Sequence, residues 1–165
     1  MLLGVDYYPE QWDTSLMDAD MDRILELGCN VIRIGEFAWH RMEKQEGQFD
    51  FSYFDGVIAM AKQKDLQVIF GTPTATPPAW FIAKYPDILS RFPDGSPRAF
   101  GGRHVACYSN PHYLEACRKI ITALAEHYRG EEGIVAWQVD NEIGHEGSDL
   151  CWCDHCRDGF LSLIH

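Results

Sequence analysis

Residues 137–144 read Trp-Gln-Val-Asp-Asn-Glu-Ile-Gly, and this stretch decides the fold class. An apolar run that begins at Ile134 predicts a buried strand, and the run ends abruptly in an amide and a carboxylate, Asn141 and Glu142. In a barrel of parallel strands, side chains at the carboxyl ends of the strands line the functional face. We therefore expect Asn141 and Glu142 to project into a pocket.

Further strands are predicted upstream, and each is followed by a helical pattern. The four predicted strands cover residues 2–6, 30–35, 67–71 and 134–140. The first helix has Asp13 or Thr14 as its N-cap, and the third begins at Asn110, with Pro111 at its first position. Between the third strand and its helix lies a long irregular segment, 72–110, which is rich in proline and turn signals. Four βα units are predicted.

This alternation indicates an α/β protein, either an open doubly wound sheet or a closed eight-stranded barrel. The first strand is followed by Tyr-Tyr-Pro-Glu at 7–10 instead of a glycine-rich phosphate loop, which argues against a nucleotide-binding sheet. A complete barrel needs about 250 residues. We therefore predict the amino-terminal half of a (β/α)8 TIM barrel, with residues 1–165 as one partial domain that stops after the fourth strand.

The composition is typical of a globular domain, and 165 residues are enough to bury a core. The formal net charge of -11 disfavours nucleic acid, because its phosphates would be repelled, and leaves neutral sugars unaffected. The amino terminus shows neither a signal peptide nor a membrane span, so we expect a cytoplasmic location. In that compartment the six cysteines are expected to be thiols or metal ligands rather than disulfides.

The adjacent Asn141 and Glu142 suggest a sugar-cleaving site. A carboxyl group can protonate a glycosidic oxygen, and a neighbouring amide can hold a sugar hydroxyl and fix the ring. An isolated Asn-Glu pair is also compatible with a helix N-cap or a surface salt bridge. The position of the pair at the end of a buried strand favours the site.

The cysteines form a second informative pattern. Cys151, Cys153 and Cys156 have the spacing Cys-x-Cys-x2-Cys, which is typical of zinc knuckles because short spacings let several thiolates converge on one ion. A fourth ligand is required. A reduced, unligated cluster or an opportunistic disulfide is the alternative. Cys29 and Cys117 lie at apolar positions and are predicted to be small core residues.

Four segments at or just past the ends of the predicted strands share an order and spacing with one enzyme family. They read Gly4-Val-Asp-Tyr-Tyr-Pro-Glu-Gln-Trp12, Arg33-Ile-Gly-Glu-Phe-Ala-Trp39, Gly101-Gly-Arg-His-Val-Ala-Cys107 and Trp137-Gln-Val-Asp-Asn-Glu-Ile-Gly144. Together they resemble the family 42 glycoside hydrolases, the mainly microbial β-galactosidases, over essentially the whole chain. The resemblance implies a retaining β-galactosidase on a (β/α)8 barrel that acts on small β-galactosides and assembles as a homotrimer.

The resemblance also implies roles for site residues. Glu142 matches the general acid/base, and Asn141 and Arg103 match binders of the galactose hydroxyls. The forked donors of Arg103 can serve two hydroxyl oxygens, and Gly101 and Gly102 before it allow close approach of the backbone to a substrate. The alternative for Arg103 is a rim residue paired with a carboxylate.

Retaining hydrolysis needs a second carboxylate about 5 to 5.5 Å from the first. In the family this nucleophile is a glutamate at the end of the seventh strand, which lies outside this chain. Glu36, at the end of the second predicted strand, is interpreted as a pocket-supporting or structural residue. The chain alone is therefore expected to be inactive.

Resemblance to the four-cysteine zinc site of the family selects Cys107 as the fourth ligand, in preference to the histidines His155, His104 and His145. Four thiolates leave no open position for water, so the zinc would be structural. It would tie the loop after the third strand to the loop after the fourth.

The predicted loops at the strand ends also contain tryptophans, namely Trp12, Trp39, Trp80 and Trp152. Their rings can stack on sugar faces or simply pack at the rim. Two other functions stay open at this point. One is another clan A hydrolase, such as a β-glucosidase or endo-glycanase, because an Asn-Glu strand ending is widely shared. The other is a non-catalytic fragment that is cross-linked by a zinc ion.

Overall fold

The computed structural model describes residues 1–144 and 150–164. Its 4-stranded sheet has the order β1-β2-β5-β6, and every pairing in it is parallel. The strands cover Gly4–Asp6, Val31–Ile34, Gln67–Gly71 and Ile134–Gln138. The predicted strands are confirmed, although β1 begins at Gly4 rather than Leu2 and β6 ends at Gln138 rather than Asp140. The prediction that β6 is buried was wrong, because β6 lies at the edge of the sheet and its residues are mostly exposed.

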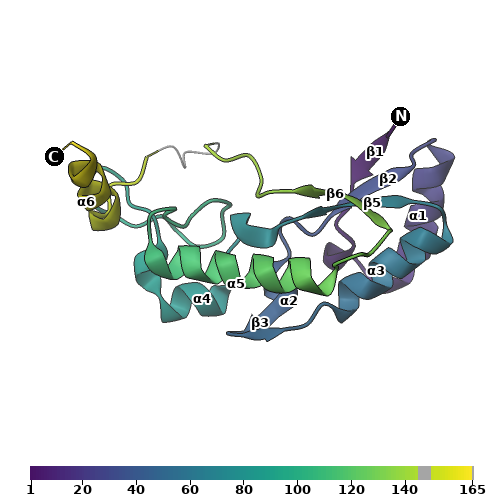
Figure 1. Cartoon of the computed structure of the whole chain (residues 1–165), viewed down its shortest axis with the longest axis horizontal. Helices are drawn as coiled ribbons and strands as arrows, with labels where there is room; N and C mark the ends of the chain where they lie inside the picture. Colours follow the sequence, from purple (N-terminus) through teal and green to yellow (C-terminus); the bar gives the residue numbers. More distant parts are fainter. Residues whose placement is uncertain (145–149, 165) are drawn as a thin grey trace.

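Helices α1, α3 and α5 connect these strands and lie on one side of the sheet (Figure 1). They cover Met17–Glu26, Ser52–Gln63 and Pro111–His127. Each buries an apolar stripe against the sheet, represented by the fully buried Met21, Phe54 and Leu124. Burial of one such side chain contributes about 1.5–3 kcal/mol, so this layer stabilises the sheet.

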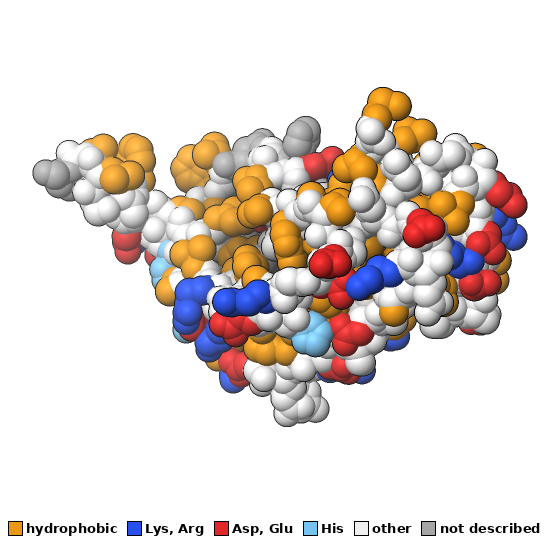
Figure 2. All heavy atoms as spheres, turned by 45° about the vertical axis from the view of Figure 1, so that its right-hand side comes forward, with side chains coloured by type: hydrophobic (Ala, Val, Ile, Leu, Met, Phe, Trp, Pro, Cys, Tyr) orange, Lys and Arg blue, Asp and Glu red, His pale blue; other side chains and the backbone are white. Residues whose placement is uncertain are grey.

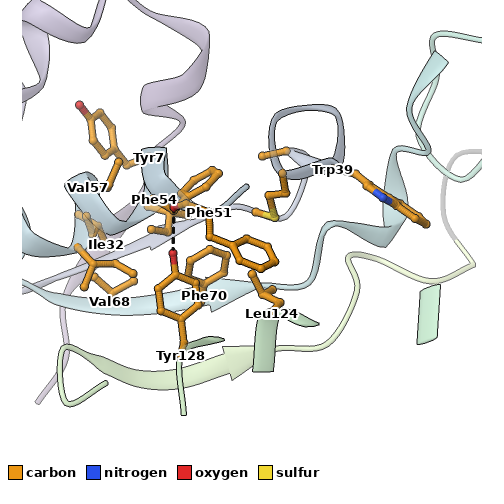
Figure 3. Packing of buried hydrophobic residues seen from close by; sticks show 14 of the residues in the cluster. Tyr7, Ile32, Trp39, Phe51, Phe54, Val57, Val68, Phe70, Leu124 and Tyr128 are labelled. Carbon is orange, nitrogen blue, oxygen red and sulfur yellow. Dashed lines mark hydrogen bonds between the residues drawn. The ribbon is translucent and has the colours of Figure 1, made fainter. Parts of the chain in front are cut away.

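Aromatic rings form the centre of the core (Figure 3). The Phe70 ring lies 5.4 Å from that of Phe54 and 5.2 Å from that of Tyr128, measured between centroids. The buried hydroxyl of Tyr128 donates to the Phe51 carbonyl at 3.5 Å. The β5 strand is therefore held between α3 and α5, which fixes where its carboxyl end lies. Cys29 is buried in the core and Cys117 packs against it, as predicted.

The helix starts are only partly as predicted. Asn110 caps α5, because its side chain accepts the N–H groups of His112 and Tyr113. Asp13 accepts the N–H of Ser15 at 2.9 Å, but it caps a short 3-10 turn, Thr14–Leu16. Helix α1 starts only after that turn, so the prediction of Asp13 or Thr14 as its N-cap was wrong.

The irregular segments contain short elements that hydrophobic periodicity does not reveal. Between β2 and α3 lie helix α2, Trp39–Met42, and an antiparallel hairpin of β3, Glu43–Gln45, and β4, Gln48–Phe49. The loop after β5 contains helix α4, Ala79–Lys84, with 3-10 turns at Pro73–Ala75 and Pro86–Ile88. A 3-10 turn at Pro9–Gln11 follows β1, and helix α6, Asp154–Leu163, lies near the carboxyl terminus.

The second face of the sheet is open. A cavity of about 260 Å³ lies against it, lined by residues that include Gly4, Asp6, Val31, Arg33 and Ile69. Within the described ranges, β1 and β6 each pair on one side only. Apolar side chains gather at the amino terminus and on α6 (Figure 2). No helix in 1–144 or 150–164 is long and apolar enough to cross a membrane.

Candidate active site and metal centre

The chain leaves β6 through a turn with an unusual backbone conformation. Asp140 and Glu142 have positive φ angles of 56° and 46°, which non-glycine residues adopt only rarely. Two hydrogen bonds hold the turn: the Asp140 N–H donates to Thr72 Oγ1, just past β5, at 2.7 Å, and the Asp140 carboxylate accepts the Asn141 N–H at 2.7 Å. The turn therefore has a fixed shape at the end of the strand.

This turn brings the predicted site residues together. Nη1 of Arg103 lies 3.2 Å from Oε2 of Glu142, and the Asn141 amide lies 3.4 Å from the same oxygen. Asn141 is buried, whereas 54% of the Glu142 side chain is exposed. The arrangement is an accessible carboxyl group between two hydrogen-bond donors. The Glu142 carboxyl group can exchange a proton with a bound molecule, while Arg103 and Asn141 can hold hydroxyl groups of that molecule.

Two further contacts orient the side chains of Arg103 and Asn141. The guanidinium of Arg103 lies over the ring of Phe37 at 5.4 Å. The side-chain amide of Gln138, at the end of β6, donates to Asn141 Oδ1 at 3.0 Å. The Asn141 side chain is thereby turned so that its own N–H group faces Glu142.

Glu36 lies beneath the surface and is fully buried. Its Oε1 accepts hydrogen bonds from the hydroxyl of Tyr8 and from Nε of Arg33, both at 2.9 Å. The carboxyl ends of β1 and β2 are further linked by the Arg33 guanidinium, which contacts Asp6 at 2.7 Å. The contacts agree with the interpretation of Glu36 as a supporting residue. Glu36 is also packed against Gly71, where an added Cβ would lie 2.6 Å from the Glu36 Cβ.

Asp6, Tyr8 and Arg33 were not predicted to be site residues. All of them lie at or just past the ends of β1 and β2. The same position rule that selected Asn141 and Glu142 could have selected them, because charged side chains on the inner face of a parallel strand are uncommon.

The tryptophans divide into two groups. Trp39 is fully buried and its indole N–H donates to the Glu43 carboxylate at 2.7 Å, while the Trp80 indole donates to the Glu43 carbonyl at 2.8 Å. Both pack against α2 and the β3-β4 hairpin. Of the two alternatives that the sequence left open, packing therefore holds for Trp39, and stacking on a sugar gains no support for Trp80. Trp12 and Trp152 are exposed and stay available for a ligand.

The structure also brings together the cysteines that the sequence analysis selected as metal ligands. The Sγ atoms of Cys107, Cys151, Cys153 and Cys156 all lie within 4.8 Å of one another. Cys107 Sγ is 3.4 Å from the Sγ atoms of both Cys153 and Cys156, and the thiols are free. Tetrahedral zinc with Zn–S bonds of about 2.3 Å sets its sulfurs about 3.8 Å apart. The observed spacing therefore fits zinc without rearrangement of the backbone.

Backbone donors point at this cysteine cluster as well. The N–H of Ser109 donates to Cys107 Sγ at 3.4 Å, and the N–H of Arg91 donates to Cys151 Sγ at 3.3 Å. Such donors stabilise thiolates, which are the form that binds metal. Burial raises the pKa of the Cys107 thiol, so a bound cation would be needed to keep that group ionised.

The cluster joins two loops. Cys107 ends the loop after β5, and the other cysteines follow β6; the Trp152 N–H also donates to the Arg91 carbonyl at 3.0 Å. Two of the histidines considered as alternative ligands, His104 and His155, are not in the cluster. His104 contacts Tyr108 instead, His155 is not part of the four-residue group, and His145 lies outside the described residues.

Comparison with known proteins gives a consistent result. A family model described as beta-galactosidase, Glyco_hydro_42, matches residues 6–165. The chain is 43% identical over 163 residues to a beta-galactosidase of Thermus thermophilus, covering 99% of this chain and 25% of that relative. It is 35% identical over 164 residues to beta-galactosidase BgaH of Haloferax lucentense, covering 99% and 25%.

Solved structures agree with these relatives. The polyextremophilic beta-galactosidase of the Antarctic haloarchaeon Halorubrum lacusprofundi matches with a TM-score of 0.94 and 34% identity, over 99% of this chain and 25% of that one. The predicted fold class is thereby confirmed: the parallel strands and their helices form the amino-terminal part of a (β/α)8 TIM barrel. The chain spans about a quarter, 25%, of the length of the curated relatives it matches.

Proposed function

Because the chain belongs to the glycoside hydrolase family 42 beta-galactosidases, we propose that the complete protein hydrolyses terminal β-D-galactosides with retention of configuration. By the complete protein we mean the product of the whole reading frame that contains this sequence. In this proposal residues 1–165 supply the acid/base half of the active site. Glu142 is the general acid and base, and Arg103 and Asn141 bind hydroxyl groups of the galactose ring.

The proposal rests on one observation, the convergence of Arg103 and Asn141 on the accessible Glu142 carboxyl group. In the first step the Glu142 carboxylic acid donates its proton to the glycosidic oxygen as the bond to the leaving group breaks. In the second step the Glu142 carboxylate removes a proton from the attacking water. Arg103 and Asn141 hold the ring so that the reacting atoms stay within reach.

Retention requires a second carboxylate that forms the covalent intermediate. Glu36 is unsuitable for attack on a sugar, because it is fully buried and its Oε1 is engaged by Tyr8 and Arg33. Following the family resemblance, we assign the nucleophile to a glutamate at the end of a later barrel strand, outside residues 1–165. The 165 residues by themselves would then lack an essential group.

We further propose that the cysteine cluster binds one structural zinc ion through Cys107, Cys151, Cys153 and Cys156. Support comes from the S–S distances and from the backbone N–H groups of Ser109 and Arg91. When bound, zinc would supply a cross-link and no reactive water, because its four positions are filled by sulfur. The protein would use this link to hold the loop of Arg103 against the segment that follows Glu142.

The decisive assay for this function compares aryl β-galactosides with aryl β-glucosides as substrates of the complete protein. A clear preference for the galactoside supports the proposal. A preference for the glucoside would indicate another clan A hydrolase, and no hydrolysis of either would leave a non-catalytic zinc protein. The stereochemistry of the first-formed sugar, read by NMR, separately tests retention.

We further propose a homotrimer that acts on small β-galactosides, as the family resemblance implies, with a cytoplasmic location as expected from the sequence. The net charge of -11 disfavours nucleic acid, and no helix in the described ranges is long and apolar enough to cross a membrane, so we propose neither as a partner. Sedimentation of the complete protein measures the oligomeric state. Fractionation of cells measures the location.

A further inference from the structure

The turn after β2 sends two consecutive side chains in different directions. Gly35 opens this turn with a φ of 91°, which favours glycine, and the N–H of Ala38 donates to the Gly35 carbonyl at 3.1 Å. An added Cβ at Gly35 would lie 2.5 Å from the Phe70 ring, so the turn packs directly on the core. As a result Glu36 is fully buried, whereas Phe37 is left half-buried just past the end of the strand.

Neighbouring loops hold Phe37 in place. The ring of Tyr8, which follows β1, lies 5.7 Å from the Phe37 ring between centroids, and the Tyr8 hydroxyl donates to the buried Glu36 at 2.9 Å. The hydroxyl of Thr76, in the loop after β5, donates to the Phe37 carbonyl at 2.9 Å. Phe37 is therefore held by residues that follow both strands paired with β2.

The side chain of Arg103 rests on this ring. Its guanidinium lies 5.4 Å from the centre of the Phe37 ring, while its Nη1 lies 3.2 Å from Oε2 of Glu142. Two exposed glycines, Gly101 and Gly102, precede Arg103 and restrict the chain little. A partly exposed ion pair also restrains a long side chain only weakly. An aromatic face attracts a guanidinium, so we expect the ring to limit the directions that the Arg103 side chain takes.

A cavity of about 360 Å³ adjoins the Phe37 ring. Its lining includes Phe37 and both of the glycines that precede Arg103. A long arginine side chain has many accessible rotamers, and free space beside it lets more of them be populated. Without the Phe37 ring the cavity would extend towards Arg103, and the guanidinium could move into it and away from Glu142. The ring therefore closes off positions in which Arg103 would not face the carboxyl group.

We propose that Phe37 is a positioning residue for galactoside hydrolysis, because its ring holds the Arg103 guanidinium beside the Glu142 carboxyl group. This inference rests on the proposed function for its kinetic consequence. Phe37 acts through Arg103, whose donors must meet the galactose hydroxyls in one geometry for the glycosidic oxygen to lie within reach of Glu142. A displacement of about 1 Å at such a site can lower the rate about 100-fold.

The first test is Phe37→Leu in the complete protein, which keeps an apolar side chain and removes the flat face. We expect kcat for an aryl β-galactoside to fall and KM to rise, with kcat/KM reduced about tenfold. Phe37→Tyr keeps the face and should retain most of kcat/KM. The matched control is Phe92→Leu, which removes a ring that lies 4.7 Å from the guanidinium of Arg98, and both constants should stay within about twofold of wild type. Equal kinetics in Phe37→Leu and Phe92→Leu, or no recovery in Phe37→Tyr, would overturn the proposal.

A double-mutant cycle tests whether Phe37 acts through Arg103. Arg103→Ala removes the guanidinium, so nothing is left for the ring to position. Adding Phe37→Leu in that background should lower kcat/KM by less than about twofold, whereas independent effects of the two substitutions would multiply. A double variant whose loss equals the product of the two single losses would overturn the proposal, because Phe37 would then act on folding or on the substrate directly.

Chemical modification gives a readout that does not depend on turnover. Phenylglyoxal reacts with accessible guanidinium groups, and 35% of the Arg103 side chain is exposed. Mass spectrometry of the peptide that contains Arg103 measures the rate. In Phe37→Leu this rate should rise about two- to fivefold, the factor that corresponds to one cation–π contact at an exposed site, and in Phe92→Leu it should not. Equal rates in the two variants would overturn the proposal. If the wild-type protein cleaves no galactoside, the proposed function fails, while these rates still decide whether Phe37 holds Arg103.

Discussion

Nη1 of Arg103 lies 3.2 Å from Oε2 of Glu142, although the residues are 39 positions apart in the sequence. One comes from the loop after β5 and the other from the turn after β6. The pair places a planar set of donors beside an accessible carboxyl group. Such a pair on a barrel rim suits recognition of a sugar more than stability, because exposed salt bridges contribute about 0–1 kcal/mol.

The first prediction concerns Arg103→Lys in the complete protein. Lysine keeps the charge but loses the fork that can serve two oxygens, so kcat/KM for an aryl β-galactoside should fall about 10- to 100-fold. The melting temperature should barely change, because the pair is partly exposed. The control is Arg118→Lys, which alters the surface salt bridge with Glu115 on α5. Equal kinetics in the two variants would argue against a role for Arg103.

The second prediction concerns metal content. Protein prepared without chelator should contain one zinc ion per chain, and Cys153→Ser should lower both the zinc content and the melting temperature. Cys117→Ser is the control, because Cys117 lies on α5 outside the cysteine cluster. Metal analysis by mass spectrometry decides the matter. Zinc near zero in the wild-type protein would eliminate the proposed metal centre.

The third prediction is that a polypeptide of residues 1–165 alone does not turn over galactosides. In our proposal the nucleophile lies outside these residues, and within the described ranges β1 and β6 each pair on one side only, which favours self-association. Release of nitrophenol from an aryl β-galactoside measures this, with Glu142→Gln as the control. Turnover that disappears in the control would place the nucleophile within these residues and make Glu36 the first one to examine.

The fourth prediction concerns acid stability. The hydrogen bond from Asn110 lowers the pKa of Asp87 below its ordinary value of 3.8. Because the pKa of Asp87 is lower in the folded than in the unfolded protein, its ionised carboxylate stabilises the folded state at pH values above the unfolded-state pKa. This stabilisation is lost as the pH falls through the folded-state pKa. The melting temperature of Asp87→Ala should therefore lie below that of wild type at pH 6, and the gap should shrink towards pH 3. A gap that does not depend on pH would refute this assignment.

Local patterns explain why parts of the molecule could be predicted. Asn110 and Pro111 specify the start of α5 through one side chain and one fixed φ angle, and both signals are contained in adjacent residues. The central strands β2 and β5 have enough apolar residues to show their burial. Cys151, Cys153 and Cys156 are likewise close in the sequence, so their spacing alone predicts that three thiols lie together.

The remaining features depend on residues distant in the sequence. The α2 helix and the β3-β4 hairpin are too short to show a period, and they are held by contacts such as the Trp39 indole with Glu43. The hydrogen bond that Glu36 accepts from the Tyr8 hydroxyl joins residues 28 positions apart.

The most direct test of the account is Glu142→Gln in the complete protein. Cleavage of lactose-like substrates, which have poor leaving groups, should fall about 10²- to 10⁴-fold, because the proton donor is lost. Aryl galactosides with activated leaving groups should be less affected in the first step. Added azide should partly restore turnover, because it attacks the glycosyl-enzyme without needing a base. An equal loss on both substrate types, with no effect of azide, would contradict the assignment of Glu142 as the acid/base.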